Sequence, residues 1–155
     1  MNAGLLLQLH ENLRSLTLGN AARHLEERLS QAEERGASYE EFLLDLTEVE
    51  LQIRSENREK RRLKEARFPL VKTLETFTFE EAPQLDRRLI GELAAGDYIS
   101  RHRNVLFLGK SGCGKTHLAT ALGIEACRKN IRVRFTTACN LVINLTDVND
   151  KIYDA

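Results

Sequence analysis

Residues 105–116 read Val-Leu-Phe-Leu-Gly-Lys-Ser-Gly-Cys-Gly-Lys-Thr. The first four are continuously apolar, which is typical of a strand buried on both faces of a parallel sheet. The last eight match the pattern G-x-x-x-x-G-K-[ST], which joins a strand to a helix. A helical pattern follows over 115–129, and residues 131–135 alternate as a second strand does. The three elements together predict a βαβ unit.

Each residue type in this octet suits a phosphate group. The glycines permit backbone angles closed to other residues, so that loop amides can approach an anion at the positive end of the following helix. Lys115 would place its ammonium between the β- and γ-phosphates, and the Thr116 hydroxyl is the expected Mg²⁺ ligand. The alternative is a glycine-rich turn without a ligand. We expect the whole octet to bind: Gly109, Lys110, Ser111, Gly112, Cys113, Gly114, Lys115 and Thr116.

Cys113, within the octet, and His117, directly after it, are interpreted as structural residues. Cys113 is interpreted as a small filler, with an oxidation-sensitive thiol as the alternative. His117 is interpreted as a helix residue packed against its neighbours rather than as a base. The three cysteines, at positions 113, 127 and 139, have neither a metal-ligand spacing nor an even number for disulfides. Without a leader or membrane-span pattern, the sequence predicts a cytoplasmic protein with no membrane contact.

The N-terminal half has only helical periodicity, which predicts helices over about 5–16, 21–35 and 38–67. Ser38 and Glu41 have the spacing of a capping box at the start of the third. Both prolines of the chain lie in the stretch that follows. We therefore predict a helical region over 1–67, a linker over 68–85 and a partial P-loop ATP-binding domain over 86–155. The predicted fold class is a partial α/β P-loop NTPase core with a parallel sheet, preceded by an all-α region.

Charge is balanced overall but segregated locally. The 23 basic and 23 acidic residues give a net charge of +0, which excludes a uniformly basic nucleic-acid coat. Residues 54–67 nevertheless contain seven bases and three acids. Lys60, Arg61 and Arg62 are therefore candidates for DNA phosphate contacts. The alternative is a solvated helix end whose bases favour the C-terminal dipole.

Several runs resemble a known family. They are Asn104–Gly123 around the octet, Arg132-Val-Arg-Phe-Thr-Thr-Ala138, and, upstream, Leu74-Glu-Thr-Phe77 and Asp97-Tyr-Ile99. Over roughly residues 1–145 the chain resembles the IstB-like transposition helper ATPases, an AAA+ class related to bacterial replication initiators and helicase loaders.

The resemblance implies ATP and Mg²⁺ as cofactors, with Gly112, Gly114, Lys115 and Thr116 in the phosphate and magnesium roles. It also implies an N-terminal helical region that contacts DNA or a transposase, and a core that forms a homo-oligomer around DNA.

The family pattern continues with a Walker B strand ending in Asp-Glu, sensor residues and an arginine finger, none of which we recognise in this sequence. Residues 142–147 are a poor Walker B candidate, because only 137–141 separate them from the preceding predicted strand and a parallel crossover needs a dozen or more residues. We expect residues 141–145 to begin a helix and Asp147 to be a surface acid. A chain truncated before Walker B would bind nucleotide and hydrolyse it very slowly, so ATPase activity stays open.

The leading functional expectation is an ATP-binding helper of DNA transposition. A replication-type helicase loader would use the same helical region to bind a helicase instead. A third interpretation is a DNA- or protein-interaction module whose P-loop is a relic.

Overall fold

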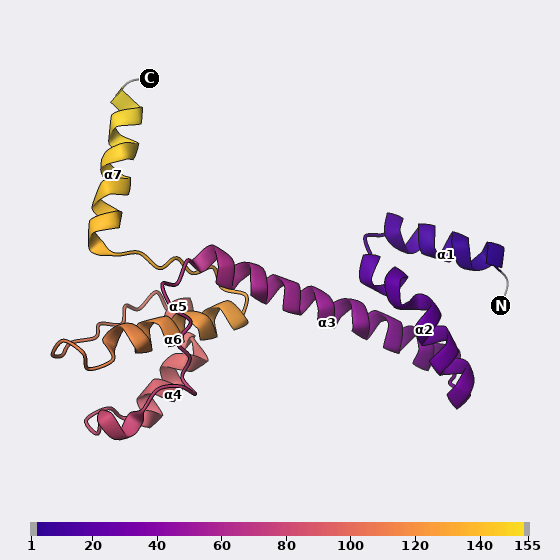
Figure 1. The fold of residues 1–155 in the computed structure, drawn as a ribbon, viewed down its shortest axis with the longest axis horizontal. Coiled ribbons are helices and arrows are strands. Elements are labelled where there is room, and N and C mark those ends of the chain that lie inside the picture. The colour runs from indigo at the N-terminus through magenta and orange to yellow at the C-terminus, as the bar shows by residue number, and fades with distance from the viewer. Residues whose placement is uncertain (1–2, 154–155) are drawn as a thin grey trace. The chain divides into compact units, whose positions relative to one another are not determined.

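The computed structural model describes the backbone of residues 3–153 and the side chains of residues 3–145. The chain divides into two compact units, one on each side of the bond between Arg58 and Glu59. The long helix α3, Tyr39–Ala66, contributes residues to both units (Figure 1). None of the described helices is long and apolar enough to cross a membrane.

The first unit contains α1 (Ala3–Ser15), α2 (Gly19–Arg35) and the N-terminal part of α3. All three helices supply apolar side chains to one small core, and α1 lies along α2. The buried centre of this core is Ala21, Leu25 and Leu46, with Leu6, Leu13, Leu18, Leu29 and Phe42 packed around it.

The predicted start of α3 is confirmed. The Ser38 N–H donates to Glu41 Oε2 at 2.7 Å, and the Glu41 N–H donates to Ser38 Oγ at 3.2 Å, which is a capping box. Gly36, at the end of α2, has the left-handed φ of 62° that a helix C-terminus commonly takes. Local capping chemistry therefore sets the turn between these two helices.

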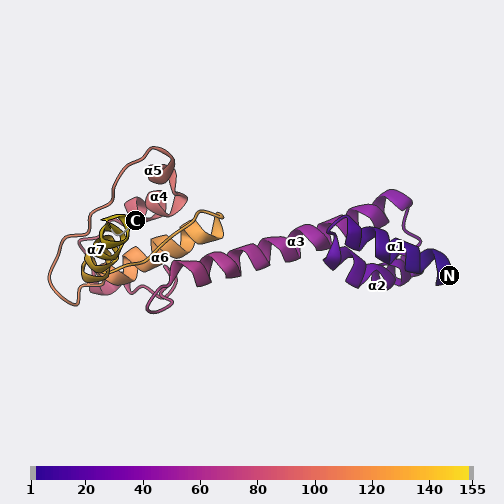
Figure 2. The ribbon, with the colours of Figure 1, turned by 90° about the horizontal axis from the view of Figure 1, so that it is seen from above.

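The second unit is organised around α6, Lys115–Arg128, whose buried side chains are Leu118, Thr120, Ala121, Leu122, Ile124, Ala126 and Cys127. The helix α4, Arg87–Ala95, packs against α6, and the short α5, Asp97–Ser100, follows it (Figure 2). A 3₁₀ turn, η1, covers Phe79–Glu81, and α7 covers Ala138–Tyr153. The helix expected over residues 141–145 is thus present within α7. Asp147, expected at the surface, lies outside the residues whose side chains are described.

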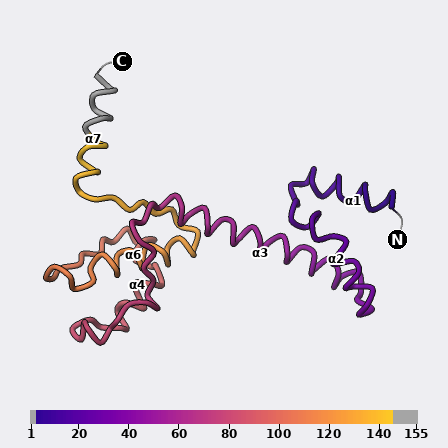
Figure 3. The backbone as a smooth tube through the Cα atoms, viewed as in Figure 1, coloured from indigo at the N-terminus to yellow at the C-terminus, as the bar shows by residue number. Residues whose placement is uncertain are grey.

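The predicted parallel sheet is wrong. No residue in the described range 3–153 belongs to a strand, and Figure 3 traces 105–108 and 131–135 as backbone outside any helix. The segment 105–108 alternates between half-buried and exposed residues, with Leu106 81% and Leu108 85% exposed. The N–H of Phe135 donates to the carbonyl of Ala66, at the end of α3, at 2.8 Å instead of to another strand.

The physical reason lies in the non-local nature of a sheet. A continuous apolar run predicts a strand only if both of its faces are covered and both of its edges find partners. Two short segments can supply one pairing at most, and an isolated pair of strands has little stability of its own. In the described part of the chain the helices around α6 form the core without a sheet.

Candidate nucleotide-binding site

The octet forms a loop that leads directly into the first turn of α6. Gly112 and Gly114 adopt φ values of 83° and 85°, a left-handed conformation that L side chains rarely take. Gly114 is the residue immediately before α6, which begins at Lys115. The first N–H groups of this helix have no carbonyl partner within the helix, and they carry the positive end of its dipole.

Lys115 closes the loop on itself. Its Nζ donates to the carbonyl oxygens of Gly109 at 2.9 Å and Lys110 at 2.5 Å, both at the opposite end of the octet. The Cys113 Sγ lies 3.7 Å from the same ammonium. The loop is therefore curved around a positive charge, next to the free amides of α6, which is an arrangement suited to a polyphosphate.

The remaining residues of the octet have simpler surroundings. The side chains of Lys110, Ser111 and Thr116 are exposed, and none of them has a side-chain hydrogen bond or ion pair. The half-buried Cys113 places its sulfur 2.8 Å from the position that a Cβ on Gly109 would occupy, so Gly109 leaves room for it. The described residues contain no group of three or more His, Cys, Asp or Glu side chains that could hold a metal ion. The magnesium role of Thr116 stays a prediction.

A cavity of about 290 Å³ opens beside the loop. Its walls come from the octet, from the start of α6, from the segment just before η1 and from η1 itself. The lining residues are Lys72, Thr76, Phe77, Thr78, Glu81, Gly112, Cys113, Gly114 and His117. Five of these nine residues lie between positions 72 and 81, and the sequence motifs did not connect that segment with the octet.

The segment 68–85, predicted as a linker, lies along α6. The ring of Phe68 lies 2.9 Å from where a Cβ on Gly123 would be, so the glycine leaves room for it. Near the start of α6, His117 Nε2 lies 2.9 Å from the Thr73 carbonyl oxygen. The signals that could have revealed this docking are the glycine and the histidine on α6, at positions where a helix interior ordinarily has larger or more apolar residues.

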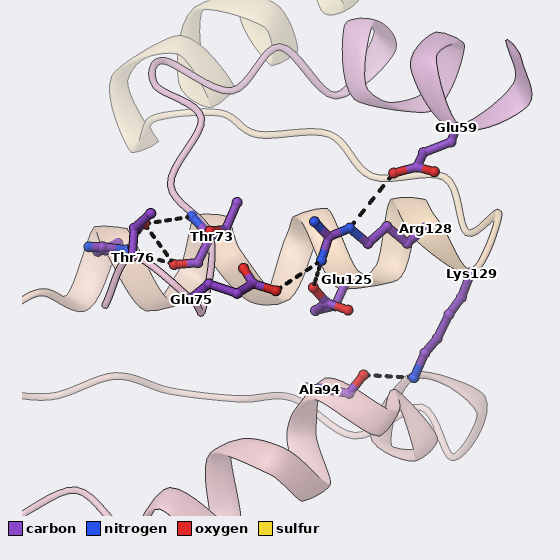
Figure 4. Close-up of polar contacts among 9 residues, drawn as sticks. Glu59, Thr73, Glu75, Thr76, Ala94, Glu125, Arg128 and Lys129 are labelled. Carbon is purple, nitrogen blue, oxygen red and sulfur yellow. Dashed lines mark hydrogen bonds and ion pairs between the residues drawn. The ribbon is translucent and has the colours of Figure 1, made fainter. Parts of the chain in front are cut away.

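Ion pairs hold the other end of α6 (Figure 4). The guanidinium of Arg128 contacts Glu59 at 3.7 Å and Glu75 at 3.4 Å, and it also pairs with Glu125. Burial by itself would lower the pKa of Arg128. The carboxylates of Glu125 and Glu75 raise the pKa by more than burial lowers it, so the net shift is upward. The neighbouring Lys129 donates from Nζ to the carbonyl of Ala94 at 2.7 Å and thereby caps the end of α4.

The three candidates for DNA contact differ in their surroundings. The Arg62 side chain is only 11% exposed, and it pairs with Glu65 at 3.2 Å and donates to Asn130 Oδ1 at 3.2 Å. Arg61 is 64% exposed and reaches Glu65 only at 3.8 Å. Lys60 is exposed. Two of the three are therefore available to a ligand, and Arg62 joins elements within the second unit.

Comparisons with known proteins agree on one family. A family described as IstB-like ATP binding protein matches residues 11–151. The protein named for ATP binding in insertion sequence IS21 of Pseudomonas aeruginosa is 40% identical over 133 residues, which cover 86% of this chain and 50% of that protein. Its counterpart in insertion sequence IS5376 of Geobacillus stearothermophilus is 36% identical over 138 residues, 89% of this chain and 55% of that protein.

A third relative, from insertion sequence IS232 of Bacillus thuringiensis, is 34% identical over 138 residues, with the same two coverages of 89% and 55%. The chain spans about half the length of these curated relatives. The match to the family model nevertheless includes the end of α1, the whole of α2 and α3, the octet and α6. The chain thus belongs to the family of IstB-like ATP binding proteins.

Proposed function

We propose that this protein binds Mg²⁺–ATP at residues 109–116 and acts as an ATP-binding helper of DNA transposition in the cytoplasm. The observation that carries the nucleotide part is the pair of hydrogen bonds from Lys115 Nζ to the carbonyls of Gly109 and Lys110. These bonds draw the two ends of the octet together around the Lys115 ammonium. The names of the relatives support both the nucleotide and the insertion-sequence context.

Each group in the site has a separate task. The amides of the loop and of the first turn of α6 would hold the β-phosphate, and Lys115 would neutralise charge on the β- and γ-phosphates. Thr116, exposed one residue into α6, would supply a hydroxyl ligand to the magnesium that accompanies the nucleotide. The cavity lined by Phe77, Thr76 and the loop glycines lies next to this position and offers space for the rest of the ligand.

We expect this chain to bind ATP but to hydrolyse it only slowly. Hydrolysis of the γ-phosphate needs a residue that orients or activates water, in addition to the groups that hold the phosphates. The octet contains no carboxylate, and Glu81 is the one acid among the described residues that line the adjoining cavity. We therefore expect bound ATP to be released largely unhydrolysed by this chain.

The transposition part of the proposal implies a transposase, DNA and further copies of this chain as partners. Lys60 and Arg61 are the exposed cations that we assign to DNA phosphates. A partner test would compare retention of the full chain on an immobilised transposase from an insertion sequence of this type and on a replicative helicase. Retention on the helicase alone would favour the loader function.

The nucleotide test uses a fluorescent ATP analogue with magnesium, titrated with the full chain. Lys115→Ala should weaken binding at least about tenfold, because it removes the charge and the bonds that shape the loop. Lys64→Ala is the matched control, since it removes an equal charge outside the octet, at an α3 position where the side chain is exposed and forms no bond. Equal binding by wild type and Lys115→Ala, with unchanged far-UV circular dichroism, would contradict the proposal.

A further inference from the structure

A small hydrogen-bond network joins α6 to the segment before η1. His117 Nε2 lies 2.9 Å from the carbonyl oxygen of Thr73 and 3.3 Å from Oγ1 of Thr76. The Thr76 hydroxyl also donates to the Thr73 carbonyl at 3.0 Å, and it accepts from the Thr73 N–H at 3.2 Å. Since a carbonyl oxygen can only accept, Nε2 carries the hydrogen and donates it.

Ring contacts reinforce the same junction. The ring of Phe77 meets that of His117 edge to face, with centroids 5.1 Å apart and an interplanar angle of 83°. A Cβ added to Gly114 would come within 2.8 Å of Phe77 Cε2. The aromatic side chain of this segment thus lies directly on the last glycine of the loop, where only a glycine leaves space for it.

The position of His117 places this junction within the phosphate-binding turn. It follows Lys115 and Thr116 in the first turn of α6, where the unpaired helix amides point toward the loop. Anything that orders this turn also orders the imidazole, and the imidazole is bonded to the backbone of the neighbouring segment. His117 further lines the cavity beside the loop, together with Thr76 and Phe77.

We propose that His117 is a positioning residue which couples nucleotide binding at residues 109–116 to the docking of segment 73–77. The inference rests on the proposed function, because the coupling requires a ligand in the loop. Coupling between two sites is reciprocal. ATP therefore tightens the docking of segment 73–77, and the docked segment raises the affinity for ATP.

The test uses the full chain with two substitutions at one position. His117→Ala removes the donor to Thr73 and should weaken Mg²⁺–ATP binding about three- to tenfold, the worth of one partly buried hydrogen bond. His117→Gln keeps an amide N–H that can reach the same carbonyl, and it should restore affinity to within about twofold of wild type. His102→Asn is the matched control, since His102 is exposed, forms no side-chain bond and has a φ of 52° that asparagine tolerates.

Hydrogen exchange provides a readout that a purely structural role would not change. In the wild type, ATP should slow amide exchange both in residues 109–116 and in residues 73–77. In His117→Ala the slowing should persist at the loop and become smaller at 73–77, where only direct contact with the ligand in the cavity would remain. The coupling would be overturned if His117→Ala kept wild-type affinity, if His117→Gln bound no better than His117→Ala, or if ATP protected residues 73–77 as strongly without the imidazole as with it.

A second variant keeps the inference testable if His117→Ala loses its helical structure. Thr76→Val removes the hydroxyl from the network at an exposed position with little change of volume. It should lower ATP affinity and ATP-induced protection of residues 73–77 in the same direction, about two- to threefold in affinity. Wild-type values for both quantities would overturn the coupling. A wild-type chain that failed to bind ATP would instead overturn the proposed function, and the coupling with it.

Discussion

The carboxylate of Glu50, on α3, accepts the N–H of Ala21, in the first turn of α2, at 2.7 Å. It also accepts the backbone N–H of Asn20 at 2.8 Å and pairs with Arg54, and Glu50 is only 3% exposed. The residue before α2 is Leu18, which provides no side-chain cap. A buried acid from another helix thus takes the role of an N-cap, and it joins α2 to α3 within the first unit.

Glu50→Ala should destabilise the first unit by about 2 kcal/mol, because it leaves buried amides of α2 and a guanidinium without their acceptor. Urea unfolding followed by circular dichroism, with amide exchange read over residues 19–50, measures the loss. Glu48→Ala is the matched control, since Glu48 is exposed on the same helix and has no bonded partner. Equal stabilities for the two variants would show that the Glu50 contacts contribute nothing measurable.

The Glu50 contacts also predict a pH dependence. Burial raises the pKa of this carboxyl, but the hydrogen bonds from Ala21, Arg54 and Asn20 and the charge of Arg54 outweigh burial, so the pKa lies below its ordinary value of 4.5. A depressed folded-state pKa gives stability that is present above the unfolded-state pKa and is lost as pH falls through the folded-state value.

The difference in unfolding free energy between wild type and Glu50→Ala should therefore be constant from about pH 7 to pH 6 and shrink below about pH 4.5, the ordinary pKa of the carboxyl. Parallel urea titrations across this range measure it. A difference that grew on acidification would mean that the neutral carboxyl is the stabilising form.

Local patterns predicted much of this chain, and non-local pairing accounts for what they missed. The helix after the octet and the capping box at Ser38 depend on neighbours within a few residues, and both are present. The prediction of a sheet was wrong because the apolar run 105–108 indicates that a segment can be buried, but not whether another segment pairs with it.

The sequence patterns could not predict the cavity beside the octet, for a related reason. Pro69 and Pro83 mark the segment between them as non-helical, and the sequence shows no periodic apolar face that would indicate docking. Its contacts with α6 come from single residues, such as Phe77 on Gly114 and Thr73 on His117. Isolated contacts between segments some 40 residues apart leave no periodic signal.

The two left-handed glycines of the loop should respond differently to alanine. Both substitutions strain the backbone, but a Cβ on Gly112 meets nothing within 4 Å, whereas a Cβ on Gly114 would lie 2.8 Å from Phe77. Gly112→Ala should cost about 1 kcal/mol of stability through backbone strain, and Gly114→Ala should cost about 1–3 kcal/mol more through the clash with the ring.

A double-mutant cycle separates the clash from the strain. Phe77→Ala should destabilise the wild type more than it destabilises Gly114→Ala, because the ring has already been displaced in that background. The coupling should be about 1 kcal/mol by thermal unfolding. In the Gly112→Ala background, Phe77→Ala should have its full wild-type cost. An additive cycle with Gly114→Ala would show that the ring moves away freely.

Of the basic residues at the end of α3, Arg62 should contribute to stability, and Lys60 and Arg61 should contribute to ligand binding. Arg62→Ala removes the contacts with Glu65 and Asn130 at a side chain only 11% exposed, so it should lower stability by about 1–2 kcal/mol. The double substitution of Lys60 and Arg61 by alanine should leave stability within about 0.5 kcal/mol, because both side chains are exposed.

We expect the same variants to affect DNA binding in the opposite way. Binding of a labelled duplex, measured over a salt series, should weaken in the Lys60/Arg61 double variant, and the slope of log K against log salt should fall by about 2, one unit for each DNA phosphate that is no longer neutralised. Arg62→Ala should keep the wild-type slope at a temperature where it remains folded. A wild-type slope for the double variant would remove Lys60 and Arg61 from the DNA contacts, and a reduced slope for Arg62→Ala would mean that its guanidinium leaves Glu65 to bind phosphate.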